Sequence, residues 1–179
     1  MSEDELKHPN HWFNRAADLH ASAGAIWDAM NHEPDAVSRR LGFAAGHSMG
    51  IACHPVYMMV CGLSLEVIMK AVLACRGEMF DDLQHHDLRK LSLAVGRDLS
   101  KQERKLLTYY EGALYWSGRY PVPKKNVQAT VRAHRRLGFD LFTSPLSGFS
   151  LKLRVRNDKD SWDNYSRLWQ SYSSMFVHR

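Results

Sequence analysis

The sequence predicts an all-α protein. Apolar residues recur at helical spacing in several segments of the 179-residue chain. Helix boundaries are marked by a capping box, Ser100 with Glu103, and by stop signals such as Gly77 and Gly96. Apolar residues make up 45% of the chain and charged residues 24%, which is typical of a globular domain that needs neither disulfides nor a metal to fold.

The N-terminal half is predicted to contain two long helices. Residues 9–30 form the first, because Pro9 suits a first helical turn and apolar residues then trace one stripe. Residues 31–50, with one proline and three glycines, are expected to be a connection. The second helix is expected to begin after His54-Pro55 and to run to Arg76. It is apolar nearly all round, a pattern typical of the middle of a bundle.

The same apolar stretch, residues 51–75, is long enough to span a bilayer. It contains Glu66 and Lys70, however, and charged groups at mid-depth in lipid are unfavourable. We therefore expect a buried central helix and no membrane association. The N-terminus is acidic with no apolar run behind it, so we expect no signal peptide and a cytoplasmic location.

The C-terminal half continues with shorter helices. Asp87 is predicted to cap a helix over residues 88–95, and Ser100 to cap one that ends near Gly118. A further helix is expected from Asn126 to Leu137, ended by Gly138. Asp160 or Ser161 caps the last helix, whose five aromatic side chains at helical spacing are expected to lie mostly in the core.

Residues 149–156 alternate apolar and polar side chains, which predicts a β-strand. A lone strand leaves its backbone groups unpaired. It must pair with a second strand not evident in the sequence or with another copy of the chain; otherwise the segment is not a strand.

Cysteine and charge give two further indications. Cys53, Cys61 and Cys75 are odd in number and fit small buried hydrophobic residues in a reducing compartment. The net charge of +5 is uneven: residues 1–118 hold twelve basic and fifteen acidic residues, and residues 119–179 hold twelve and four. The basic C-terminal third suggests a polyanionic partner, although a solvated basic face without a partner is an equal alternative.

Three spaced motifs in residues 59–125 resemble the HEPN family of helical bundles. They are a Glu66-x-x-x-Lys70 pattern in an apolar helix, a His86-Asp87-Leu88 helix start, and an Arg119-Tyr120-Pro121 helix ending. The resemblance implies an up-and-down four-helix bundle over residues 1–125. Residues 126–179 are then a basic C-terminal extension packing on the same core, with a helix and, if residues 149–156 are extended, one short strand.

The family's ribonucleases carry an arginine followed four to six residues later by a histidine. Arg119 occupies the matching place here, but the next histidine is His134, so the motif is missing. Arg40 and His47 have the right spacing by chance, in the glycine-rich connection. The resemblance therefore implies a non-catalytic variant, and the chain is not expected to be an enzyme.

The motif residues have two interpretations. Glu66 and Lys70 could act as an acid–base pair, but a structural ion pair completed by His86 or Arg119 is the favoured interpretation. His85-His86-Asp87 lacks the spacing of a metal site, so capping by Asp87 is favoured. The motif cluster thus consists of Glu66, Lys70, His86, Asp87, Arg119 and Tyr120. We expect no metal site and no cofactor.

Basic residues of the C-terminal third are candidates for phosphate contacts. They are Lys124, Lys125, Arg132, Arg135, Arg136, Lys152, Arg154 and Arg156. Arg132, Arg135 and Arg136 share one helical face, whereas His134 between them is expected to be solvated.

The function expected from these patterns is a non-catalytic module that binds RNA or nucleotide. Alternatively it docks a partner in a prokaryotic defence, toxin–antitoxin or nucleotidyltransferase-associated system. The resemblance implies a homodimer and a nucleotidyltransferase or antitoxin as partner. The alternatives are a metal-independent endoribonuclease with a non-standard active site and a purely structural interaction domain. Neither the RNA nor the partner can be identified from the sequence.

Overall fold

The computed structural model describes residues 8–78, 85–146 and 153–178. Within these residues the chain forms seven α-helices, one π-helical turn and a two-stranded sheet, so the predicted all-α class is confirmed. The elements, in chain order, are α2 (Pro9–Asn31), α3 (Pro34–Arg40), α4 (Met49–Cys75), α5 (Leu88–Ala94), α6 (Lys101–Gly112), η2 (Ala113–Ser117), α7 (Val127–Phe142), β1 (Thr143–Pro145), β2 (Arg154–Arg156) and α8 (Trp162–Ser173).

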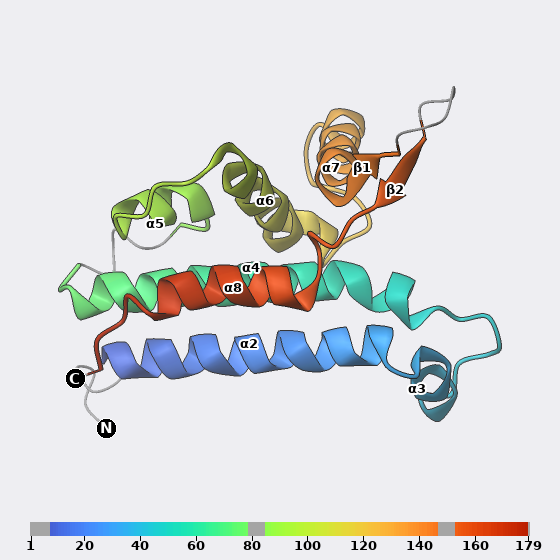
Figure 1. Cartoon of the computed structure of the whole chain (residues 1–179), viewed down its shortest axis with the longest axis horizontal. Coiled ribbons are helices and arrows are strands. Elements are labelled where there is room, and N and C mark those ends of the chain that lie inside the picture. Colours follow the sequence, from blue (N-terminus) through green and yellow to red (C-terminus); the bar gives the residue numbers. More distant parts are fainter. Residues whose placement is uncertain (1–7, 79–84, 147–152, 179) are drawn as a thin grey trace.

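Helix α4 is the centre of the fold. It runs antiparallel to α2, and α8 lies alongside them (Figure 1). Helices α5 and α6 and the turn η2 pack on α4 as well. By length and composition α4 could cross a membrane, but 78% of its most apolar window is buried inside the fold. The prediction that this segment is a buried central helix is confirmed.

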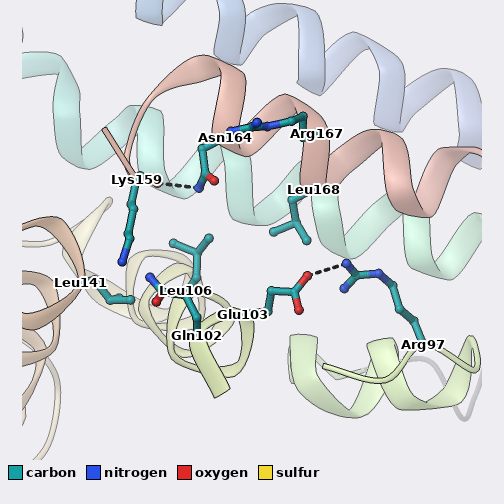
Figure 2. Close-up of a pocket in the computed structure, with 9 residues that line it drawn as sticks. All are labelled: Arg97, Gln102, Glu103, Leu106, Leu141, Lys159, Asn164, Arg167 and Leu168. Atoms are coloured by element: carbon teal, nitrogen blue, oxygen red, sulfur yellow. Dashed lines mark hydrogen bonds and ion pairs between the residues drawn. The ribbon is translucent and has the colours of Figure 1, made fainter. Parts of the chain in front are cut away.

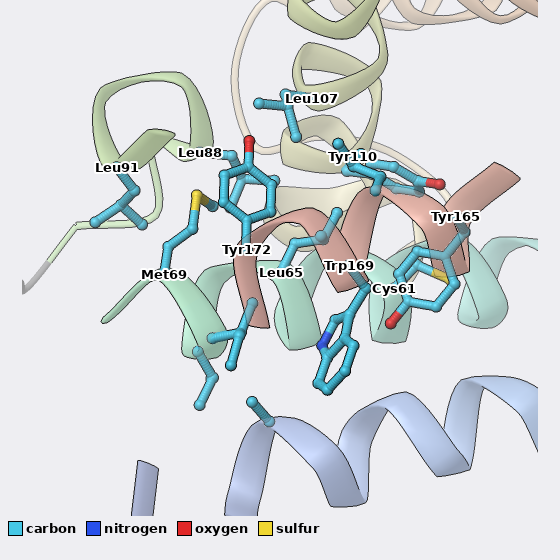
Figure 3. Close-up of a cluster of buried hydrophobic side chains, with 14 of the residues drawn as sticks. Cys61, Leu65, Met69, Leu88, Leu91, Leu107, Tyr110, Tyr165, Trp169 and Tyr172 are labelled. Atoms are coloured by element: carbon cyan, nitrogen blue, oxygen red, sulfur yellow. The ribbon is translucent and has the colours of Figure 1, made fainter. Parts of the chain in front are cut away.

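The core is built from side chains of both halves of the chain. Side chains of α4, α5, α6 and α8 meet in one cluster, in which Cys61 and Leu65 lie among Tyr110, Tyr165 and Tyr172 (Figure 3). The aromatic stripe of α8 therefore belongs mostly to the core, as its helical spacing predicts. Helix α7 and the β-hairpin, by contrast, project from the layer that α2, α4 and α8 form (Figure 1).

The predicted start of α4 is wrong. The helix begins at Met49, where the Ser48 hydroxyl accepts a hydrogen bond from the Ile51 amide, and Pro55 lies inside it. A proline near the start of a long helix removes one hydrogen bond, which extensive packing can offset. The expected connection over residues 31–50 also contains the short helix α3.

The predicted starts of α5 and α6 are confirmed. The Asp87 carboxylate accepts a hydrogen bond from the Lys90 amide at the start of α5. Ser100 and Glu103 form the reciprocal capping box of α6. These caps satisfy amide groups that have no partner within their own helix.

The predicted end of α7 is too early. The helix continues through Gly138 to Phe142. A Cβ atom at residue 138 would lie 2.8 Å from the ring of Tyr109, so this glycine allows α7 to approach α6 and does not end the helix. A glycine at a close contact and one at a helix end give the same sequence signal.

The strand predicted over residues 149–156 is observed as β2, which covers Arg154–Arg156; residues 149–152 lie outside the described residues. It pairs antiparallel with β1 of the same chain, with Ser144 opposite Val155. The pairing strand is thus in the chain itself and not in a second copy.

A buried carboxylate connects this hairpin to α4. Asp160, 4% exposed, accepts a hydrogen bond from Arg156 and lies 3.4 Å from Nε2 of His54. Burial alone would raise the pKa of Asp160, but its bonds to His54 and Arg156 outweigh burial and lower the pKa. Arg156, whose side chain is 66% exposed, is therefore tethered at the surface by this buried carboxylate.

Candidate functional site

Glu66, Lys70 and His86 form a polar cluster at the edge of the core. Nζ of Lys70 donates to Oε1 of Glu66 over 2.7 Å, and both side chains are buried. Nδ1 of His86 lies 2.9 Å from Oε2 of the same carboxylate. The structure thus has the ion pair completed by histidine that the sequence suggests. Arg119, the alternative third member, has no hydrogen bond or ion pair with Glu66.

The bond to Glu66 determines how the His86 ring is used. An ionised carboxylate can only accept hydrogen bonds, so Nδ1 of His86 carries the proton. In the neutral ring Nε2 is then left as an acceptor, and it has no partner among the described residues. The side chain is 55% exposed. His86 is therefore a half-exposed imidazole whose orientation and tautomer are fixed by a buried carboxylate.

The Arg119–Tyr120 motif follows a π-helical turn. The amide of Gly118 donates to the carbonyl of Ala113 over 3.1 Å, which closes the wider turn of η2. A Cβ atom at residue 118 would lie 2.4 Å from Cβ of Met59 and 2.9 Å from the carbonyl oxygen of Pro55. Gly118 therefore allows the end of η2 to lie against α4.

His86 and Arg119 line one open groove with a volume of about 590 Å³. Its apolar floor comes from α4 and η2, and its rim carries two tyrosines and two cations. The lining residues are Met59, Leu63, His86, Leu114, Tyr115, Arg119, Tyr120 and Lys124. Since none of them is acidic, the groove favours an anionic ligand with flat or apolar parts.

The two tyrosines of the groove have opposite electrostatic surroundings. Burial, and then the negative charges of Glu111, Asp87 and Glu66, raise the pKa of Tyr115. The hydrogen bond from Arg119, and then its charge, lower the pKa of Tyr120. The guanidinium carbon of Arg119 lies 5.3 Å from the centre of the Tyr120 ring. Positive charge is thus concentrated at the Arg119 end of the groove.

Asp87, the remaining motif residue, has a structural position. It caps α5, and its carboxylate also lies 4.0 Å from Nε of Arg89 and 3.9 Å from Nζ of Lys90. It does not line the groove. Burial would raise its pKa, but the bond from the Lys90 amide and the charge of Arg89 lower it.

The predicted basic surface is divided in space. Arg132, Arg135 and Arg136 are exposed on the outer face of α7, away from α6, and Lys125 precedes this helix. Lys124 lines the groove. Lys152 lies outside the described residues.

Two members of this set are engaged within the chain. Arg154 donates to Thr143 and lies over the ring of Phe139, and Arg156 binds Asp160. These contacts use part of the hydrogen-bonding capacity of each guanidinium, although both side chains remain exposed.

His134 is half-buried, so the expectation that it is solvated is wrong. Its ring stacks on Tyr109 with centroids 4.3 Å apart, and its Nε2 lies 3.1 Å from the Ser117 hydroxyl. The residue faces α6, while its arginine neighbours in sequence face outward. In the sequence His134 lies within a run of basic residues, which gives no indication that its side chain faces inward.

Burial of His134 predicts a dependence of stability on pH. Burial lowers the pKa of His134, and also that of His20, below their ordinary value. As the pH is lowered below about 6.5, the unfolded state therefore binds more protons than the folded state. The free energy of unfolding decreases over this range until the pH lies below the pKa values of the folded state. We expect urea denaturation to show lower stability at pH 5.5 than at pH 7.5. His134→Gln should reduce this difference, and an unchanged difference would contradict the assignment.

The other possible sites contribute nothing to the groove. His47 stacks on Phe43 at 4.0 Å between ring centroids, and it has no hydrogen bond or ion pair with Arg40. Among the residues of the described ranges, no group of three or more His, Cys, Asp or Glu side chains could hold a metal ion. The sequence grouped His86 and Arg119 in one motif cluster, but it did not indicate that they line an open groove.

Comparisons of the chain with protein-family models, with curated proteins and with solved structures give no match. The resemblance to HEPN domains therefore depends on the motifs alone.

Proposed function

We propose that this chain is a HEPN-like helical module that binds single-stranded RNA or a nucleotide without cleaving it. The observation that carries the proposal is the groove in which His86, Arg119 and Lys124 meet Tyr115 and Tyr120. Cations that contact phosphates, next to aromatic rings on which bases can stack, are the usual components of single-strand recognition.

The arrangement of the motifs supports the same proposal. Glu66 and Lys70 come from α4, His86 precedes α5, and Arg119 follows η2. Residues of three separate motifs thus line one groove or lie beneath it, so that a single ligand in the groove would be affected by all three motifs. The exposed arginines of α7 offer a second basic surface along which a longer strand could extend.

A cellular context follows from the resemblance and belongs to the proposal. It is a cytoplasmic homodimer that acts with a nucleotidyltransferase or an antitoxin in a prokaryotic defence or toxin–antitoxin system. Fold alone does not give function, so RNA binding is the part of the proposal to be tested first.

Neutralising the cations of the groove tests the binding function. We expect Arg119→Gln with Lys124→Gln to weaken binding of a labelled single-stranded RNA about tenfold, measured by fluorescence anisotropy. Loss of two phosphate contacts should also make the slope of log affinity against log salt shallower by about 1.4.

The matched control removes two exposed cations elsewhere, Arg39→Gln with Lys101→Gln, which changes the net charge equally. An equal loss of affinity in the control pair would show that binding reflects net charge and not the groove. If the wild-type chain does not bind RNA at all, docking to a protein partner becomes the surviving function.

A second candidate function, metal-independent RNA cleavage, is favoured by one observation. His86 has its Nε2 available and its tautomer fixed by Glu66, and it lines the same groove as Arg119. Such an imidazole could take the proton of a ribose 2′-hydroxyl as that oxygen attacks the adjacent phosphorus. The P–O5′ bond would break, the leaving 5′-oxygen would take a proton from water, and Arg119 would stabilise the charge on the phosphoryl oxygens.

Cleavage is tested by incubating labelled RNA with the protein in the presence of a chelator. An enzyme of this kind produces 2′,3′-cyclic phosphate ends, and both His86→Gln and Arg119→Gln abolish them. Bound but intact RNA supports the non-catalytic module.

A further inference from the structure

A second pocket lies on another side of the molecule, between α6, the end of α7 and the start of α8 (Figure 2). Its volume is about 280 Å³, and it shares no lining residue with the groove. Leu106, Leu141 and Leu168, one from each helix, form an apolar floor and are all buried. The pocket therefore provides a small hydrophobic surface that is accessible from solvent.

Polar groups without partners gather at one end of this floor. Nζ of Lys159 points toward Gln102 and Leu141 (Figure 2). Neither Lys159 nor Arg167 forms an ion pair with any residue in the described ranges. Asn164 donates through its Nδ2 to the carbonyl of Lys159 over 2.7 Å, which orients this segment. The ammonium group of Lys159 therefore lies beside the leucine floor and has no anionic partner among the described residues.

The opposite end of the pocket is closed by a satisfied pair. Arg97 donates to Glu103 and to the hydroxyl of Tyr172, while Glu103 also accepts from the Ser100 amide. The one carboxylate that lines the pocket is therefore neutralised, and Lys159 and Arg167 leave an excess of positive charge.

We propose that this pocket binds a small amphipathic anion. A carboxylate or phosphate head is held by Lys159 and Gln102, and a short apolar body lies over Leu106 and Leu168. The volume lies at the lower limit of known ligand pockets, which restricts the occupant to about ten non-hydrogen atoms. This inference does not depend on RNA binding, since the two sites are separate.

Three probes separate the contributions of charge and apolar surface in NMR titrations of the isotopically labelled full chain. Hexanoate has both features, hexylammonium has the same body with the opposite charge, and inorganic phosphate is an anion without a body. We expect saturable shifts around Leu106 and Lys159 with hexanoate, and binding at least tenfold weaker for the other two. Equal binding of phosphate or of hexylammonium would overturn the proposal, and so would the absence of shifts with hexanoate.

A variant tests the position of the head. Lys159→Met keeps an unbranched side chain that is one atom shorter and removes the charge, and it should weaken hexanoate binding about tenfold, the effect of one charge-assisted hydrogen bond. Because Nζ of Lys159 has no partner, thermal unfolding should remain unchanged. Lys125→Met, an exposed lysine outside the pocket, is the control and should bind hexanoate as the wild type does. Unchanged binding by Lys159→Met overturns the assignment.

Discussion

Glu66→Gln is expected to lower the free energy of unfolding by about 3–5 kcal/mol, because it leaves the buried ammonium group of Lys70 without a counter-charge. Glu66 is 3% exposed and Lys70 7% exposed, so water cannot replace the lost carboxylate. The same substitution leaves His86 a single amide oxygen as acceptor in place of the two carboxylate oxygens that lie near its Nδ1. Urea denaturation followed by tryptophan fluorescence measures the effect.

Two variants make this result specific to the buried pair. Adding Lys70→Met to Glu66→Gln should recover part of the stability, since no uncompensated charge then remains in the core. Asp28→Asn removes one partner of an ion pair with His32 in which both side chains are more than two-thirds exposed, and it should leave stability unchanged. If Glu66→Gln behaves like Asp28→Asn, the cluster is not a buried ionic site.

Gly118→Ala is the second substitution expected to have a large effect. The added methyl group would lie 2.4 Å from Cβ of Met59 and 2.9 Å from the carbonyl oxygen of Pro55, so η2 must move away from α4. Overpacking of this kind destabilises a fold by about 1–3 kcal/mol. Since Arg119 and Tyr120 directly follow Gly118, RNA affinity should also fall, and the two effects should appear together.

Gly50→Ala is the matched control for this close approach. A Cβ atom there would have no neighbour nearer than 3.8 Å, and the residue lies in the first turn of α4. Alanine favours a helix over glycine, so stability should stay the same or rise by up to about 1 kcal/mol. Similar unfolding curves for the two variants would contradict the proposed contact between η2 and α4.

Local signals predicted most of the helices in this fold. The capping box at Ser100 and the cap at Asp87 act within one turn of chain, so the sequence contains the whole interaction. The start of α4 was missed because Pro55 is a strong stop signal, whereas the packing that offsets it comes from distant segments. The partner strand β1 has three residues, too few for a recognisable alternation.

The candidate site was predicted only in part for the same reason. The Glu66–Lys70 pair could be predicted, because residues four apart on a helix are neighbours. The groove depends on how the end of η2 meets α4, which only the packing around Gly118 determines. The basic residues formed a single set in the sequence. In the structure, intramolecular contacts engage Arg154 and Arg156, and Lys124 lines the groove whereas the arginines of α7 do not.

The proposed RNA site is tested most directly by photocrosslinking. Single-stranded RNA containing 4-thiouridine is bound to the full chain at low salt and irradiated, and the crosslinked peptides are identified by mass spectrometry. The proposal predicts crosslinks at the groove, at Tyr115, Tyr120 or Lys124, which disappear when Arg119 and Lys124 are both changed to glutamine. Crosslinks confined to the outer face of α7 around Arg132 and Arg135, or none at any described residue, would contradict it.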